Sequence, residues 1–302
     1  MKVLSLFDGI SCGRVALERA GIKVEKYYAS EIKKNAIKVS KFNYPDIIHI
    51  GDVNDVDFIK YNDVDLLIGG SPCQDFSRGN KERLGLKGNK SSLFYKFLEA
   101  KKIINPKYFL LENVVMSLDD NIFISKSLGV EPVNINSSLV SGQLRDRFYW
   151  TNITGNSGLF GNMIKQPDDK NIKLEDVLEN GYCPLSKSRC LLESDSRPLS
   201  TPVKMFHRFY STGFTTLVFK TIEHYFSCKK HYDKYYKGLS TDNFNLDNSV
   251  YGGVRYLTSN ELEELQTLKK GYCRILKRNE TACLCGDGWN IDTIAHICRG
   301  LK

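Results

Sequence analysis

The sequence predicts an α/β protein with a doubly wound, mostly parallel sheet and a smaller domain that is irregular or β-rich. Three observations predict this fold. Short apolar runs alternate with amphipathic stretches over the first half of the chain. Chemically reactive residues follow the ends of those apolar runs. Beyond about residue 154, Gly, Asn, Ser and aromatic residues appear without helical periodicity, which indicates a domain boundary.

The apolar runs set the predicted strands, and the amphipathic stretches between them set the helices. Strands are expected over 2–7, 26–30, 47–50, 65–69, 108–113, 132–135 and 147–152. Helices are expected over 13–21, 33–42, 91–104, 259–268 and 288–301. The first helix places Val15, Ala16, Leu17 and Ala20 largely on one side and closes at Gly21.

Composition narrows the class of protein. With 302 residues, 41% of them hydrophobic, the chain can bury one large core or a large and a smaller one. There is no apolar run of about 18 residues, and the N-terminus reaches an acid at Asp8, so neither a membrane span nor a signal peptide is expected. We therefore expect a cytoplasmic protein.

Cysteine usage and charge point away from metals and toward a polyanionic partner. The nine cysteines form no paired C-x-x-C spacing, so neither a disulfide framework nor a zinc ribbon is predicted, and no metal is expected. The net charge of +8 suits a polyanion. The segment 207–238 interleaves Lys, Arg and His with Tyr and Phe, a mixture that can meet phosphates and bases together, although a half-solvated β-rich surface is the plainer interpretation.

The carboxyl ends of the predicted strands carry an unusual set of residues. In open α/β sheets the ligand crevice lies at this edge. The strand ends deliver Phe7-Asp8-Gly9 with Gly13, then Glu31, Asp52, Cys73 and Glu112-Asn113. Singly, Glu31 and Asp52 could be helix caps or surface acids, and a loop cysteine is usually inert. Together, at successive strand ends, they predict an active site.

With those residues in place, the chain resembles the DNA (cytosine-5)-methyltransferase family over nearly its whole length. The segment FDGISCGRVAL is similar to the family's first cofactor motif, and GGSPCQDFS to its nucleophile motif. LENV at 111–114 and QLRDR at 143–147 are similar to the glutamate and Q-x-R-x-R motifs, and RPLST at 197–201 is a weaker match. The nearest likeness is to the catalytic domains of de novo methyltransferases, although the length favours a bacterial or phage enzyme.

The resemblance implies a Rossmann-like fold that binds S-adenosyl-L-methionine and releases S-adenosyl-L-homocysteine. It implies a catalytic domain over 1–153, a target recognition region over 154–254, and a C-terminal segment over 255–302 that returns to the catalytic domain. The implied cofactor contacts are Phe7, Asp8, Gly9, Ile10, Cys12, Gly13, Glu31, Ile32, Asp52, Val53, Gly70, Pro72, Leu93, Gly288 and Trp289. Asp287-Gly288 departs from the family's final motif.

The chemistry explains why these residue types are needed. C5 of cytosine is a poor nucleophile, and a thiolate that adds to C6 makes C5 able to attack a sulfonium methyl group. Cys73 is the expected nucleophile. Glu112 is expected to hydrogen-bond or protonate N3, Asn113 to hold the glutamate loop, and Arg145 and Arg147 to supply positive charge. The base that removes the C5 proton is not identified by the sequence.

The expected partner is double-stranded DNA, with the target base flipped out of the helix. Contacts are expected from Gln74, Ser77, Arg78, Lys81, Arg83, Lys187, Arg189, Arg197 and Arg208. The protein is expected to be a monomer that does not bind a membrane. A cognate restriction endonuclease is a possible further partner. Two alternatives remain: a tRNA cytosine-5 methyltransferase, whose Cys-Phe-Thr signature is absent, and a catalytically weak DNA-binding relative.

Overall fold

The computed structural model describes residues 1–71, 92–154, 164–196, 202–238 and 248–301, which divide into two compact units. The first unit comprises Met1–Asn136, Asp146–Asp168 and Trp289–Lys302. The second comprises Ser137–Arg145 and Asp169–Gly288. The chain therefore changes unit four times, after Asn136, Arg145, Asp168 and Gly288.

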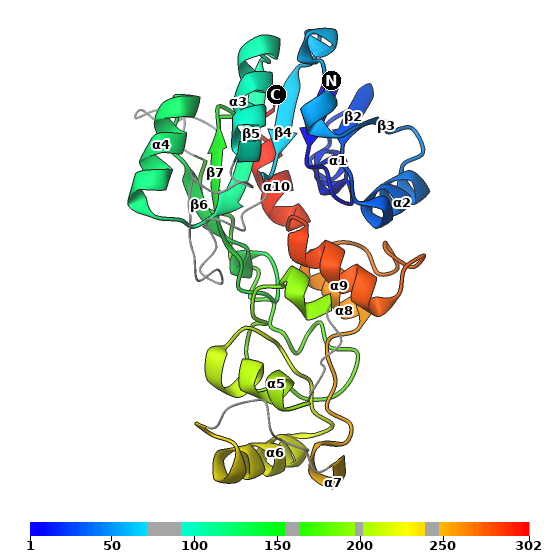
Figure 1. The fold of residues 1–302 in the computed structure, drawn as a ribbon, viewed down its shortest axis with the longest axis vertical. Coiled ribbons are helices and arrows are strands. Elements are labelled where there is room, and N and C mark those ends of the chain that lie inside the picture. The colour runs from blue at the N-terminus through cyan, green and yellow to red at the C-terminus, as the bar shows by residue number, and fades with distance from the viewer. Residues whose placement is uncertain (72–91, 155–163, 197–201, 239–247, 302) are drawn as a thin grey trace. The chain divides into compact units, whose positions relative to one another are not determined.

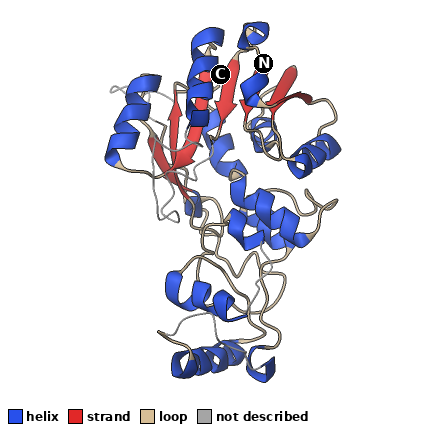
Figure 2. Ribbon diagram, viewed as in Figure 1, coloured by secondary structure: helices blue, strands red, loops and turns tan. Residues whose placement is uncertain are grey.

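The first unit is built on one seven-stranded sheet in the order β3-β2-β1-β4-β5-β7-β6 (Figure 1, Figure 2). Its strands are β1 (Lys2–Leu6), β2 (Lys26–Ser30), β3 (Ile48–Gly51), β4 (Leu66–Gly69), β5 (Tyr108–Val114), β6 (Val133–Asn136) and β7 (Asp146–Thr151). The strands β1 to β5 pair in parallel, and β7 is antiparallel to both β5 and β6. The predicted α/β fold with a mostly parallel sheet is confirmed.

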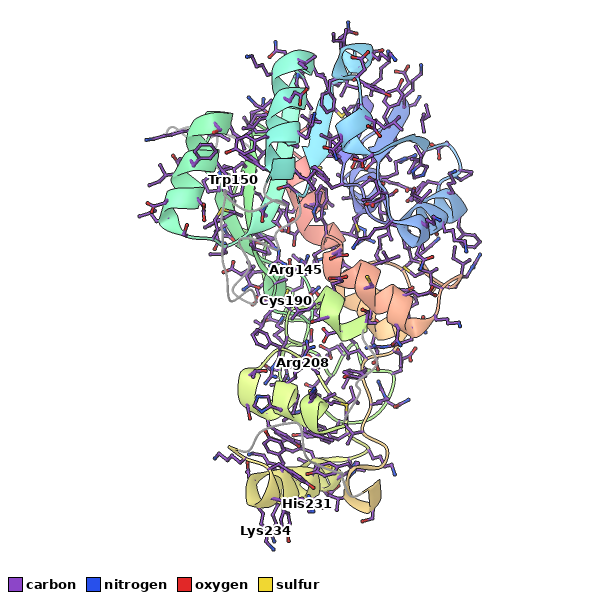
Figure 3. All side chains as sticks on the ribbon, viewed as in Figure 1. Arg145, Trp150, Cys190, Arg208, His231 and Lys234 are labelled. Atoms are coloured by element: carbon purple, nitrogen blue, oxygen red, sulfur yellow. The ribbon has the colours of Figure 1, made fainter. Side chains whose placement is uncertain are left out.

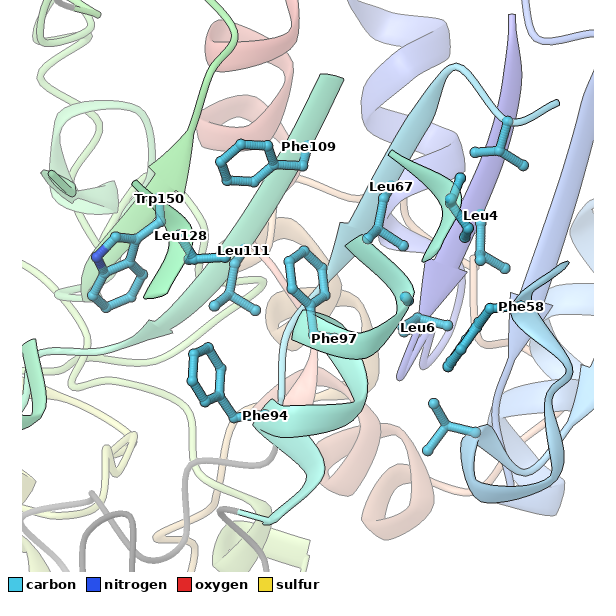
Figure 4. Close-up of a cluster of buried hydrophobic side chains, with 14 of the residues drawn as sticks. Leu4, Leu6, Phe58, Leu67, Phe94, Phe97, Phe109, Leu111, Leu128 and Trp150 are labelled. Carbon is cyan, nitrogen blue, oxygen red and sulfur yellow. The ribbon is translucent and has the colours of Figure 1, made fainter. Parts of the chain in front are cut away.

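Helices cover both faces of this sheet. The helices of the first unit are α1 (Cys12–Arg19), α2 (Lys34–Asn43), α3 (Ser92–Ile104), α4 (Leu118–Leu128) and α10 (Ile291–Cys298). Leu67 of β4 belongs to a buried cluster with Phe94 and Phe97 of α3 (Figure 4). A Cβ atom built at Gly13 of α1 would overlap the side chain of Ile68. Because neighbouring strand residues point to opposite faces, α3 and α1 lie on opposite faces, as a doubly wound sheet requires.

The strand bounds shift by one residue or so from those predicted, and one helix of the first unit was not predicted. The first strand stops at Leu6 rather than Phe7 because Phe7 has a left-handed backbone conformation, φ 59°. Helix α4 was missed although its ends carry clear signals. Ser117 caps it through the Asp120 amide, and Gly129 closes it at φ 75°.

The second unit has two smaller apolar cores and is mostly helical or irregular. Its helices are α5 (Pro202–His207), α6 (Ile222–Tyr235), α7 (Asn248–Tyr251), α8 (Ser259–Leu265) and α9 (Arg278–Asp287), with a π-helical turn at Arg208–Thr212. One core surrounds Leu262 and Leu265; the other gathers Phe206, Phe219 and Tyr232.

The β-rich character predicted for this region is wrong for its described residues. Pairing there is limited to isolated bridges such as Tyr182 with Phe219 and Val218 with Arg255. Tyr, Phe and Thr favour strands intrinsically, but here Phe219 and Tyr232 fill an aromatic core beside α6, and this packing overrides the local preference.

We expect Trp150→Phe to lower the free energy of unfolding by about 2 kcal/mol. Trp150 is fully buried in the main core, and its indole Nε1 donates to Ser125 Oγ at 3.0 Å. Urea unfolding followed by the fluorescence of Trp289, the chain's other tryptophan, measures the loss. Tyr95→Phe, at a position 45% exposed on α3, is the control and should change stability by less than about 0.5 kcal/mol. Equal effects would contradict the assignment of Trp150 to the core.

Candidate active site

The turn after β1 alternates left-handed residues. Phe7, Gly9 and Ser11 have φ values of 59°, 61° and 61°. Glycine adopts this conformation without strain, but a bulky residue such as Phe7 rarely does, and such strain gathers at functional sites. The buried carboxylate of Asp8 accepts from Ser11 Oγ at 2.6 Å and from the Tyr27 hydroxyl at 2.7 Å. Its carboxylate is therefore engaged inside the protein.

Glu31 ties the end of β2 to this turn. Its Oε2 accepts from the Gly9 amide, and its Oε1 accepts from the amides of Ile32 and Lys33, all at 2.8 Å. The helix-cap interpretation and the cofactor interpretation are compatible here, because a carboxylate has about four lone-pair sites and three are used. A ribose hydroxyl can still donate to Glu31. Ile32 beside it is 67% exposed, which leaves an apolar surface for a flat ring.

Asp52 and Gly51 shape the turn after β3. Gly51 has φ 84°, and its carbonyl accepts from Ser30 Oγ at 2.8 Å. Asp52 caps a short 3-10 turn through the Asn54 amide at 2.9 Å. Val53, Ile10 and Cys12 are buried, and Leu93 packs against the main core. The cofactor contacts assigned to these residues stay predictions.

Trp289 packs beside two glycines of the first unit. A Cβ atom at Gly70 would lie 2.6 Å from the Trp289 indole nitrogen and 3.2 Å from Glu112 Oε2. A Cβ atom at Gly13 would lie 3.6 Å from the same indole ring and 2.8 Å from the Tyr27 hydroxyl. Only glycine allows the backbone this close, so the sequence-predicted residues Gly13, Gly70 and Trp289 do come together.

Glu112 and Arg147 form a largely buried ion pair. Arg147 Nε lies 2.9 Å from Glu112 Oε1, and the two side chains are 12% and 10% exposed. Both come from the antiparallel pair β5 and β7, where Glu112 stands opposite Tyr149 and Arg147 stands opposite Val114. The two side chains therefore share one face of the sheet, two residues apart along the diagonal.

Asn113 bonds to Ser71, which precedes the segment predicted to carry the nucleophile. Its Nδ2 donates to Ser71 Oγ at 3.1 Å and to the Ser71 carbonyl at 3.4 Å, and both residues are buried. The role predicted for Asn113, holding the glutamate loop, stays a prediction. Eight predicted site residues lie outside the described residues: Pro72, Cys73, Gln74, Ser77, Arg78, Lys81, Arg83 and Arg197.

Arg145 is predicted to supply positive charge to the thiolate, but its guanidinium donates to backbone carbonyls. It is 3% exposed in the second unit, where its Nη2 donates to the Gly288 carbonyl at 2.7 Å and its Nη1 to the Gly286 carbonyl at 3.4 Å. These carbonyls end α9, so the guanidinium caps that helix and favours its negative dipole end. Gln266 Nε2 donates to the same Gly288 carbonyl at 3.2 Å. The Gly288 carbonyl thus accepts hydrogen bonds from both Arg145 and Gln266.

Three cations predicted to contact DNA have structural partners instead. The Lys187 ammonium donates to the carbonyls of Ser138, Ser141 and Ile172 at 2.6, 3.0 and 2.5 Å, which uses all three of its donors. Arg189 donates to two carbonyls and stacks on the Phe209 ring, with its centre 5.1 Å from the ring centroid. Arg208 pairs with Asp195 at 3.3 Å. A sequence cannot reveal such internal partners.

Metal clusters and membrane-spanning helices are both absent from the residues that the structure describes. No cluster of three or more His, Cys, Asp or Glu side chains in that part of the chain is placed to hold a metal ion. No helix within the described ranges has the length and apolar composition needed to cross a membrane.

The comparisons with known proteins give the family. Residues 1–122 match the family model described as C-5 cytosine-specific DNA methylase. Residues 1–122 therefore belong to the C-5 cytosine-specific DNA methylase family. The family predicted from the motifs is confirmed.

Curated relatives of this methylase family are found in phages and bacteria. The orphan methyltransferase M.SPRI of Bacillus phage SPR is 39% identical over 116 residues, which are 38% of this chain and 26% of that protein. The type II methyltransferase M.Eco47II of Escherichia coli is 44% identical over 114 residues, 37% of this chain and 27% of that protein. The alignment thus spans about a quarter of the length of these relatives.

Solved structures share the fold over nearly the whole chain. A DNMT2 mutant of Spodoptera frugiperda gives a TM-score of 0.67 at 20% identity and covers 99% of both chains. The methyltransferase EhMeth of Entamoeba histolytica gives 0.70 at 14% identity, covering 100% of this chain and 97% of the other. At these identities the likeness shows the fold alone.

We expect Arg147→Met to lower the free energy of unfolding by about 3 kcal/mol, because it leaves the buried Glu112 carboxylate without its cation. Urea denaturation measures this loss. Adding Glu112→Gln should recover part of it, since the uncompensated charge disappears.

Arg19→Met is the matched control for that experiment. Arg19 pairs with Asp292 at 2.5 Å, but the two side chains are 35% and 18% exposed, so its removal should cost less than about 1 kcal/mol. If both arginines cost the same, Glu112 is not held as a buried carboxylate by Arg147.

Proposed function

We propose that the chain is a DNA (cytosine-5)-methyltransferase that moves a methyl group from S-adenosyl-L-methionine to C5 of a flipped-out cytosine in duplex DNA. The observation that carries the proposal is the Glu112–Arg147 pair, held beside the Asn113–Ser71 contact at the entry to the Cys73 loop. A carboxyl fixed by a guanidinium on a rigid strand pair is suited to bind a ring nitrogen and its neighbouring carbonyl oxygen.

The cofactor residues fit such a ligand. Glu31 keeps an unused acceptor site for a ribose hydroxyl, Ile32 offers an exposed apolar side chain, and Phe7 presents a ring at the strand end. When bound, S-adenosyl-L-methionine supplies an electrophilic methyl group on a sulfonium centre. The carboxylate of Glu31 would orient it through a ribose hydroxyl.

Residues of the chain divide the methyl transfer into separate steps. The Cys73 thiolate forms a bond to C6, and the electron pair of the C5–C6 double bond becomes available at C5 while N3 takes a hydrogen bond or proton from Glu112. Glu112 must first take up that proton from solvent, because an ionised carboxylate has none to donate. Arg147 holds Glu112 and can donate to the O2 atom of the base. C5 then bonds to the methyl carbon while the bond from that carbon to the sulfonium sulfur breaks, and S-adenosyl-L-homocysteine would be the leaving group. A base removes the C5 proton, and the electrons of that C–H bond re-form the C5–C6 double bond as the Cys73 thiolate leaves.

We expect Cys73→Ala to abolish methyl transfer while the affinity for S-adenosyl-L-methionine stays within a few fold. Duplex DNA carrying 5-fluorocytosine should trap a covalent adduct on Cys73, because fluorine at C5 cannot leave as a proton. Mass spectrometry of the tryptic adduct identifies the cysteine.

Cys283→Ala, at a half-buried cysteine of α9, is the matched control and should retain transfer and trapping. An adduct on any cysteine other than Cys73, or normal turnover by Cys73→Ala, would refute the nucleophile assignment.

DNA contacts outside the catalytic residues are proposed on the outer face of α6. Cys228 and Tyr232 turn into the aromatic core, which leaves Lys230 and Lys234 exposed; Lys234 projects away from the helix (Figure 3). Phe226 and Tyr235 on the same helix are 60% and 46% exposed. Exposed lysines with aromatic neighbours suit phosphates and unstacked bases.

The double variant Lys230→Gln/Lys234→Gln should weaken DNA binding and reduce the slope of log affinity against log salt by about 2, one for each lost phosphate contact. Fluorescence anisotropy between 50 and 200 mM salt measures the slope. Lys126→Gln, at an exposed position of α4, should leave it unchanged. An unaltered slope in the double variant would exclude α6 from the DNA contact.

An RNA substrate is the second candidate, because the catalytic motifs are shared with the tRNA branch of the family. The absent Cys-Phe-Thr signature favours DNA. Tritium transfer from labelled cofactor to duplex DNA and to tRNA, measured side by side, separates the two.

A further inference from the structure

A buried chain of hydrogen bonds links the turns that carry the predicted cofactor contacts. Ser11 Oγ lies 2.6 Å from Asp8 Oδ2 and 2.7 Å from Ser40 Oγ, and Ser40 Oγ lies 3.1 Å from His49 Nε2. Asp8 and Ser11 belong to the turn after β1, Ser40 to α2, and His49 to β3 just before Gly51 and Asp52. Ser11 and Ser40 are fully buried.

The geometry gives this chain one consistent direction. Each hydroxyl has a single proton to donate. Ser11 gives its proton to the Asp8 carboxylate, so Ser40 must donate to Ser11, and His49 Nε2 must carry the proton that Ser40 accepts. His49 Nδ1 is buried and has no hydrogen-bond partner among the described residues, which agrees with a neutral ring protonated at Nε2. The Tyr27 hydroxyl donates to the other Asp8 oxygen at 2.7 Å.

We propose that Asp8 is a positioning residue rather than a cofactor ligand, and that its ionised carboxylate is the terminal acceptor of an Asp8–Ser11–Ser40–His49 relay that fixes the cofactor turns. The relay in this direction needs an ionised Asp8, because the single O–H of a protonated carboxyl would face one of the two donors, Ser11 on Oδ2 or Tyr27 on Oδ1. Cofactor affinity therefore falls when Asp8 takes up a proton. This inference rests on the proposed use of S-adenosyl-L-methionine.

Burial and nearby charges shift the pKa values of Asp8 and His49, the two titratable groups of the relay. Burial raises the pKa of Asp8 from 3.8 to about 6, against hydrogen bonds from Ser11, Ser5 and Tyr27 that lower it, and the nearby Glu31 raises it further. Burial and the charge of Lys41 lower the pKa of His49, while Glu31 raises it. The folded protein thus binds the Asp8 proton more readily than the unfolded chain does, so the relay is complete above about pH 6 and is lost as pH falls through that value.

The test is calorimetric titration of the whole chain with S-adenosyl-L-methionine and its product S-adenosyl-L-homocysteine between pH 5 and 8. The wild-type dissociation constant should rise at least about fivefold from pH 7.5 to pH 5. Asp8→Asn should bind about tenfold more weakly at pH 7.5 and lose the pH dependence. Tyr27→Phe and Ser40→Ala should weaken binding several fold although neither side chain is a proposed cofactor contact.

Ser125→Ala is the matched control, since Ser125 is a buried serine on α4 that accepts from Trp150 and lies outside the relay. It should lower stability without changing cofactor affinity or its pH profile. A second, binding-independent measurement is nitrogen NMR of His49, which should report protonation at Nε2 in the wild type and a changed ring signal in Ser40→Ala.

The outcomes separate the relay from the proposed function. If the wild type binds the cofactor but Asp8→Asn and Ser40→Ala bind equally well, the relay is overturned and the function stands. If the pH dependence persists in Asp8→Asn and disappears in His49→Gln, the assignment to Asp8 is overturned. If the wild type binds no S-adenosyl-L-methionine at any pH, both the function and the inference fail.

Discussion

The register of one antiparallel strand pair sets the geometry of the candidate active site. Glu112 and Arg147 lie on one face only because Glu112 stands opposite Tyr149 and Arg147 two residues further along β7. A shift of one residue would turn Arg147 to the other face and leave the Glu112 carboxylate buried without its cation. Burying such a charge alone is costly, so the ion pair itself selects the register. The catalytic proposal and the fold therefore depend on the same interaction.

The sheet was predictable because its strands are short apolar runs with sharp ends. Leu66–Ile68 and Leu110–Leu111 are buried in the sheet, and the residues that follow each run stand at its carboxyl edge. The helices of the second unit were less predictable. Helix α6 carries aromatic and β-branched neighbours typical of strands, and it is helical because Cys228 and Tyr232 pack into a core formed by residues distant in sequence.

The site was predictable where a residue acts through its own strand, and less so where it acts through a distant partner. Glu112, Asn113 and Arg147 follow from strand ends and alternation. Arg145 precedes β7 by one residue and donates to the carbonyls of Gly286 and Gly288, which are more than a hundred residues away. The ammonium group of Lys187 likewise donates to three backbone carbonyls. Nothing in a pattern of charges distinguishes a cation that caps a helix from one that meets a phosphate.

Tyr27, Ser40 and His49 were missed for a related reason. Each is an ordinary residue of a strand or helix, and only the folded structure shows that Tyr27 contacts Asp8 and that Ser40 and His49 connect to it through Ser11. The available signal was weak: Asp8 is an acid directly after a buried strand, where an unpaired carboxylate would be unfavourable. An acid in such a place requires donors, and the nearby hydroxyls of the first strands and helices are the natural candidates.

The Phe7–Ser11 turn shows how these polar contacts maintain a strained backbone. The left-handed conformations of Phe7 and Ser11 cost roughly 1–2 kcal/mol each. Hydrogen bonds to charged groups contribute about 1.5–3 kcal/mol each, and the turn has three: Ser11 and Tyr27 to Asp8, and the Gly9 amide to Glu31. The carboxylates of Asp8 and Glu31 thus hold the turn from two sides. The amides of Asp8, Gly9 and Ser11 are themselves bonded to Ser30, Glu31 and Asp8, so the shape of the turn is fixed by contacts within the protein before any ligand binds.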